Sequence, residues 1–91
     1  MDNKIILESL ASDLKRISLG IQRGSFSMAR RFSQEALARK AEIDCNYVDG
    51  YVIKLLNRME MSLKNLASDR VSEDILMCSV ILQNYCLKKL S

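Results

Sequence analysis

Residues 3–23, NKIILESLASDLKRISLGIQR, decide the fold of this chain. Leucine and isoleucine recur in this stretch at alternating intervals of three and four residues, at Leu7, Leu10, Leu14, Ile17 and Ile21. Side chains at that spacing gather on one face of an α-helix, and Ile6 widens the resulting stripe. The sequence therefore predicts a helix over residues 3–23 that packs against its neighbours through one apolar face.

Three further segments carry the same helical spacing. They span about residues 26–42, residues 47–66 and a last stretch that reaches Leu90. We expect breaks at Gly24, where glycine suits the end of a helix and Ser25 the next N-cap, at residues 44–46 and at residues 67–70. The chain has no proline and three glycines in its 91 residues, too few for the turns of a β-rich domain.

We therefore expect an all-α fold: one compact, four-helix bundle-like domain over residues 1–91. The short connections favour antiparallel neighbours. The expected apolar positions of the second and third helices include Phe26, Ala29, Phe32, Ala36, Leu37 and Ile43, and then Val48, Val52, Leu55, Met59, Leu63 and Leu66.

The last helix differs from the other three because it is apolar on two sides. One stripe is formed by Ile75, Cys78, Leu82, Tyr85 and Cys86, and the other, on nearly the opposite side, by Leu76, Val80 and Leu87. A helix with two apolar sides must be covered on both. Either this helix lies at the centre of the bundle, or one stripe meets a second copy of the protein. We expect a homodimer, with Leu76, Val80 and Leu87 as candidate self-association residues, although the sequence leaves open which stripe is internal.

Composition argues against catalysis and ligand binding. The chain has no histidine, which is the commonest general base and a frequent metal ligand. It also has no Cys-x-x-Cys pair and no glycine-rich phosphate loop, so we expect no catalytic residues, no metal and no cofactor. Three cysteines, an odd number, indicate reduced thiols and a cytoplasmic protein, with Cys78 and Cys86 in the core and Cys45 in a break. No signal peptide or membrane span is expected.

Positive charge is concentrated in residues 15–40, which hold seven basic residues and one acid and so carry +6, against −3 in the remainder. Such asymmetry can indicate an anionic partner. On the second helix, however, the basic residues spread over about half the circumference, as on an ordinary solvated surface. The candidate anion or nucleic-acid contacts are Arg30, Arg31, Gln34, Arg39, Lys40, Asn46 and Tyr47. Tyr47 and Tyr51, one turn apart, suit a core edge or a subunit contact, with stacking on a base as the alternative.

Residues 32–51, FSQEALARKAEIDCNYVDGY, resemble the helix-turn-helix of phage-repressor-like regulators. Ser33-Gln34-Glu35 matches the opening of that family's first motif helix. The residues at its packing, turn and recognition-helix positions are Leu37, Ala38, Ala41, Ile43 and Val48. The resemblance implies that Gln34 approaches phosphate, and that the residues on or near a groove-facing helix are Cys45, Asn46, Tyr47, Asp49 and Gly50.

The same stretch departs from the family in three places. Glu42 replaces the usual turn glycine, Asp49 adds negative charge to the reading surface, and the apolar period continues to Leu66. Our leading hypothesis is therefore a non-catalytic, self-associating helical module that presents a surface to itself and to a protein partner. The alternative is a small helix-turn-helix-like DNA-binding transcriptional regulator that acts through residues 32–51.

Overall fold

The computed structural model describes residues 3–44, 46, 48–66 and 70–89. Within these ranges the chain forms four helices and no strand: α1 (Asn3–Gln22), α2 (Phe26–Ala41), α3 (Gly50–Leu63) and α4 (Val71–Lys89). The prediction of an all-helical, four-helix fold is confirmed. None of the helices in the described part of the chain combines the length and the apolar character needed to cross a membrane.

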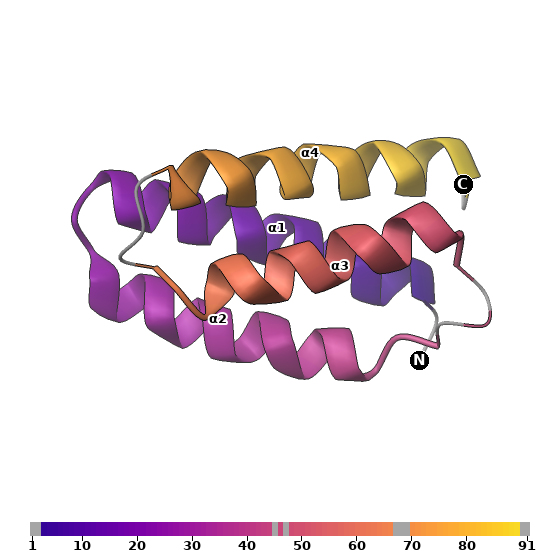
Figure 1. Ribbon diagram of the computed structural model, residues 1–91, viewed down its shortest axis with the longest axis horizontal. Coiled ribbons are helices and arrows are strands. Elements are labelled where there is room, and N and C mark those ends of the chain that lie inside the picture. The colour runs from indigo at the N-terminus through magenta and orange to yellow at the C-terminus, as the bar shows by residue number, and fades with distance from the viewer. Residues whose placement is uncertain (1–2, 45, 47, 67–69, 90–91) are drawn as a thin grey trace.

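The four helices form a bundle of about 35 × 20 × 19 Å in which each helix runs antiparallel to the next (Figure 1). The start of α1 and the end of α4 consequently lie at the same end of the bundle. α1 packs most extensively, against α4 on one side and α2 on the other, while α3 closes the bundle through smaller contacts with α4 and α2.

The core is built from the apolar stripes of all four helices. Leu7, Leu10, Leu14 and Ile17 of α1 are fully buried, as the spacing of residues 3–23 predicts, and Ile21 packs at the edge. The other helices contribute these buried side chains: Ala29, Ala36, Val52, Leu56, Met59, Leu63, Val71, Ile75, Cys78, Leu82, Tyr85 and Cys86. Some positions differ from expectation: Leu56 and Val71 are buried without having been predicted, and Phe26 is 44% exposed at the start of α2.

The turn between α1 and α2 confirms the role predicted for Gly24. Gly24 has a φ of 78°, which is the left-handed conformation that glycine adopts without a steric penalty. Its amide donates to the Ile21 carbonyl (3.1 Å), and the Ser25 amide donates to the Gly20 carbonyl (2.7 Å). This pair of bonds is the Schellman motif that ends many helices. Ser25 occupies the N-cap of α2, but its side chain makes no capping hydrogen bond.

The connection between α2 and α3 is longer than the sequence indicated, because α3 begins at Gly50 rather than near Tyr47. The segment is fastened to α1 by a reciprocal pair of bonds of 3.0 Å, in which the Asn3 side chain donates to the Asp44 carbonyl and accepts from the Asp44 amide. The Asn46 amide donates to the Asp44 carboxylate (3.1 Å). These bonds satisfy backbone groups of Asp44 and Asn46 that have no partner within a helix.

The last break ends at Arg70, which has a φ of 67°, and α4 follows from Val71. Glu73 and Asp74 lie in the first turn, where their negative charge is stabilised by the positive end of the helix dipole. Ser72 lies inside the helix and so is not its N-cap.

Candidate functional site

The two apolar sides of α4 have different environments. Ile75, Cys78 and Leu82 are completely buried, and Tyr85 and Cys86 nearly so. Leu76, Val80 and Leu87, which we call the outer stripe, are 37%, 49% and 63% exposed. The structure therefore assigns the first stripe to the monomer's own core and leaves the outer stripe on the surface.

The position of α4 explains this difference. α4 contacts α1 and α3 and lies along one edge of the bundle (Figure 1). Two neighbouring helices cover one broad side of a helix, but they cannot also cover the opposite side. A central position for α4, the monomeric alternative that the sequence left open, is therefore not what the structure shows.

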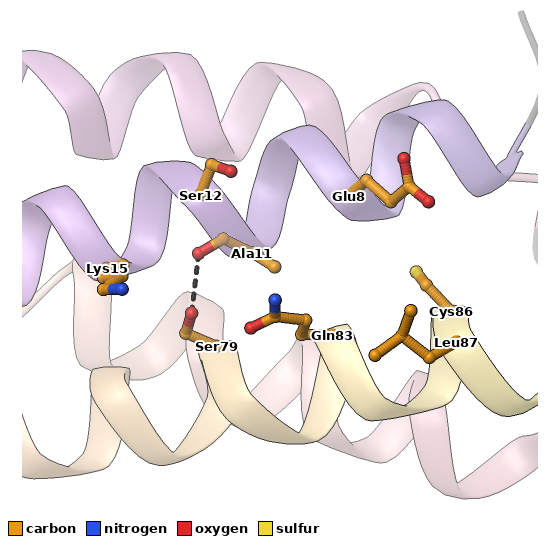
Figure 2. Close-up of a pocket in the computed structure, with 8 residues that line it drawn as sticks. All are labelled: Glu8, Ala11, Ser12, Lys15, Ser79, Gln83, Cys86 and Leu87. Atoms are coloured by element: carbon orange, nitrogen blue, oxygen red, sulfur yellow. Dashed lines mark hydrogen bonds between the residues drawn. The ribbon is translucent and has the colours of Figure 1, made fainter.

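A groove of about 320 Å³ runs between α1 and α4 beside the outer stripe, and we call it the α1–α4 groove. Small side chains, those of Ala11, Ser12 and Ser79, line the groove where the two helices meet. There the Ser79 hydroxyl donates a hydrogen bond of 2.6 Å to the Ala11 carbonyl (Figure 2). Gln83 and Leu87 line the α4 side. Glu8 and Lys15 lie toward opposite ends of the groove on α1. The groove thus has Leu87 of the outer stripe on its α4 side and two opposite charges on its α1 side.

Glu8 and Lys15 were not among the residues singled out from the sequence. They are two helical turns apart on the same exposed side of α1. Among the described residues, neither forms an ion pair within the monomer. Their common side follows from their spacing, but only the packing of α4 beside α1 shows that they share a groove with Leu87.

The structure does not gather the candidate anion-binding residues into one patch. Arg39 faces α1, where its Nε lies 3.3 Å from Oδ2 of the buried Asp13. Lys40 faces α3, where its Nζ lies 3.1 Å from Oε1 of Glu60. That contact lowers the pKa of Glu60 through a hydrogen bond and the positive charge of Lys40, with a smaller contribution from Lys64. Two of the predicted cations are therefore engaged in contacts between helices.

The other candidates remain at the surface. Arg30, Arg31 and Gln34 are exposed on α2, and in the described part of the chain neither arginine has a carboxylate within ion-pair distance. Asn46 is exposed in a short turn, and Tyr47 lies outside the described residues.

The helix-turn-helix resemblance implied a helix that begins near Cys45. In the structure Asn46 and Asp49 precede α3, and Gly50 is its first residue. Helix-turn-helix motifs join two helices at about 90–120° through a turn of three or four residues. Here α2 and α3 are antiparallel neighbours joined by residues 42–49 (Figure 1). The local geometry therefore differs from the motif that the sequence resembles.

Asp13 is the one ionisable side chain of α1 that is almost completely buried. Burial raises the pKa of its carboxyl above the ordinary value, and the nearby Arg39 and Arg16 only partly offset this effect. Within the described residues, Oδ2 of Asp13 has no hydrogen-bond partner, because the Arg39 contact has the distance of an ion pair without the geometry of a hydrogen bond. The contact of Asp13 with Arg39 joins α1 to α2, and burial of the charged carboxylate away from water reduces the stability that this contact contributes.

The cysteine thiols and Tyr51 show no arrangement of a reactive site among the described residues. Cys78 and Cys86 are buried free thiols, as predicted, and burial raises the pKa of both. Tyr51 is half exposed and packs edge-on against Tyr85, with ring centroids 5.7 Å apart. Cys45 lies outside the described residues. Among the residues that are described, no group of three or more Cys, Asp or Glu side chains could hold a metal ion.

No protein-family model, curated protein or solved structure matches this chain.

Proposed function

We propose that this protein is a non-catalytic helical interaction module that associates with a second copy of itself through the outer stripe of α4. The observation that carries the proposal is the exposure of Leu76, Val80 and Leu87 on one side of a helix whose other side is fully buried. Folding alone does not require apolar residues on the outer side, and soluble monomers generally avoid contiguous exposed apolar patches.

Two properties of the outer stripe suit a twofold contact. It lies on a regular helix next to another regular helix, so a second copy can approach without rearranging the backbone. In a twofold dimer each residue occurs on both sides of the interface, so a single apolar stripe is covered by its own copy. Residues at the centre of such an interface carry most of its binding energy.

DNA binding remains the alternative, and the geometry supports it less. A regulator needs several cations on one surface, since phosphate contacts supply most of the affinity. Arg39 and Lys40 contact carboxylates on different helices, which leaves Arg30 and Arg31 as the accessible cations of the predicted set. Self-association is therefore the better supported of the two proposals, because it accounts for the exposed outer stripe and does not need a cluster of cations.

The test is to place a charge on the outer stripe. Val80→Asp should convert the dimer into a monomer in sedimentation velocity, because an unpaired charge buried at an interface costs several kcal/mol. The control is Met61→Asp, which changes a side chain 74% exposed on α3 and should leave the mass unchanged. Unchanged association of the Val80→Asp variant would reject the outer stripe as the interface.

A further inference from the structure

The exposed side of α4 carries a regular spacing that includes polar residues as well as the outer stripe. Its members follow alternating intervals of three and four residues, at Glu73, Leu76, Val80, Gln83 and Leu87. All five side chains are exposed in the monomer. Alternation of three and four residues is the pattern with which one helix packs along another in a coiled coil. The outer side of α4 therefore suits packing along a second helix.

The charges on this side lie at its two ends and have opposite signs. Glu73 is in the first turn of α4, and Lys88 is in its last turn. Glu73 is seven residues before Val80 and Lys88 is eight residues after it, about two helical turns in each direction, so both lie close to the line of the outer stripe. Among the described residues, neither side chain forms an ion pair. The outer side thus has an acid at one end, a base at the other and apolar residues between them.

We infer that the second copy packs its own α4 against this side in the antiparallel direction. The twofold axis lies in the plane of the contact and crosses α4 at right angles near Ile81. This inference depends on the proposed self-association and adds the direction of the two helices and the contacts between them. Rotation about such an axis brings α4 face to face with its copy and exchanges the two ends of the helix. A residue before Ile81 then faces the residue that lies equally far after Ile81 in the second copy.

The outer stripe is self-complementary under this rotation. Leu76 lies five residues before Ile81 and Leu87 lies six residues after it. The two leucines therefore face each other across the contact with a difference in level of one residue, about 1.5 Å. Val80 lies beside the axis and faces Gln83 of the second copy. Gln83 also lines the α1–α4 groove, so its amide lies at the edge of the contact toward α1.

The charges select the antiparallel direction. Glu73 lies eight residues before Ile81 and Lys88 lies seven residues after it, so Glu73 of each copy is level with Lys88 of the other to within one residue. A parallel dimer, whose axis runs along α4, would instead place Glu73 beside Glu73 and Lys88 beside Lys88. Like charges in contact oppose association, whereas opposite charges favour it and fix the register. The opposite partial charges at the two ends of a helix add to the same preference.

Charge reversal at the two ends of α4 tests this contact. Glu73→Lys and Lys88→Glu each replace two attractive pairs per dimer by two repulsive ones. Each variant alone should self-associate roughly tenfold more weakly than the unaltered protein at low salt. An equimolar mixture of the two variants should associate as a heterodimer, because both of its cross-copy pairs are again of opposite sign. The double variant E73K/K88E should self-associate like the unaltered protein for the same reason.

The double variant also separates the charged contact from the stability of the helix. Glu73 is stabilised by the positive end of the α4 dipole, so Glu73→Lys lowers the stability of the fold as well. The double variant carries the same change and adds an unfavourable charge at the other end of the helix. Its recovered association therefore cannot come from a more stable monomer. The matched controls are Glu42→Lys and Lys54→Glu, which reverse exposed charges outside α4 and should leave association unchanged.

Sedimentation velocity of each variant, combined with native mass spectrometry of the mixture, gives the result. Weak single variants with a restored mixture and a restored double variant would support the antiparallel contact. If the unaltered protein is dimeric and the single variants associate equally well, the antiparallel contact is wrong and self-association stands. A mixture that associates more tightly than the unaltered protein would then assign the parallel direction. Weak single variants that neither the mixture nor the double variant restores would also overturn the antiparallel contact. A monomeric unaltered protein would overturn both proposals.

Discussion

Ser79 of α4 donates a buried hydrogen bond of 2.6 Å to the carbonyl oxygen of Ala11, at the point where α1 and α4 approach each other. A hydroxyl on a small side chain at this level serves two purposes. It allows the two helices to lie close together, and it satisfies its own polar group inside the contact. The contact between α1 and α4 sets both the core of the monomer and the shape of the surface proposed for self-association.

Substitutions at Ser79 should separate these two effects. Ser79→Ala removes one hydrogen bond and should lower the free energy of unfolding by about 0.5–1.5 kcal/mol. Ser79→Leu should cost more, about 1–3 kcal/mol, because the larger side chain forces the helices apart. Urea denaturation measures both values. Equal stability of the Leu variant and the unaltered protein would show that the contact is loosely packed.

The pH dependence of stability should carry the signature of Asp13. Because burial raises the pKa of its carboxyl above 3.8, the folded protein holds this proton at pH values where the unfolded chain has lost it. Its contribution to stability is therefore complete below the unfolded pKa and declines as pH rises through the folded pKa. Asp13→Asn cannot ionise, so its stability relative to the unaltered protein should improve as pH rises through this interval. Urea midpoints of both proteins across mildly acidic to neutral pH measure the effect, and parallel curves would contradict the assignment.

Two glycines should respond in opposite directions to alanine. Gly24→Ala places a Cβ on a residue with φ of 78° and should destabilise the protein by about 1 kcal/mol. Gly50→Ala, at the first residue of α3, meets no atom within 4 Å of the added Cβ. It should stabilise the protein by about 0.4–1 kcal/mol, because alanine restricts the unfolded chain. Thermal denaturation of the pair checks both signs, and a stabilised Gly24→Ala variant would argue against the Schellman turn.

The prediction for nucleic acid follows from the ion pairs that Arg39 and Lys40 of α2 form with Asp13 and Glu60. We expect no saturable binding of duplex DNA at physiological salt in a fluorescence anisotropy titration, because the accessible cations of the predicted set are few. A different outcome would be informative. If DNA does bind, the slope of log binding constant against log salt concentration should be compared with that of the Arg30→Ala, Arg31→Ala double variant. A slope shallower by about 1.8 in the variant would assign two phosphate contacts to these residues and favour the regulator.

Much of the fold could be predicted from the sequence because helical spacing is a local property. The stripe from Leu7 to Ile21 needed no knowledge of its neighbours to be recognised as the buried side of α1. The start of α3 could not be predicted in this way, since the backbone of Asp44 is bonded to Asn3, which is far away in sequence. Leu56 was missed because the predicted stripe passed through Leu55, and the orientation of a helix within the bundle decides between adjacent positions.

The candidate site was only partly accessible to sequence analysis. Both stripes of α4 were visible in the sequence, but equal apolar character could not decide which one faces α1 and α3. The basic residues show the same limit, because the contacts of Arg39 with Asp13 and of Lys40 with Glu60 join different helices. Glu8 and Lys15 become candidates only once the α1–α4 groove is known.

The most direct test of self-association is the molar mass of the unaltered protein, measured by light scattering after size-exclusion chromatography over a range of micromolar concentrations. The chain has a mass of 10.4 kDa, so the proposed dimer should show about twice that value and should lose mass on dilution. A constant mass of 10.4 kDa at every concentration would contradict self-association through the outer stripe of α4.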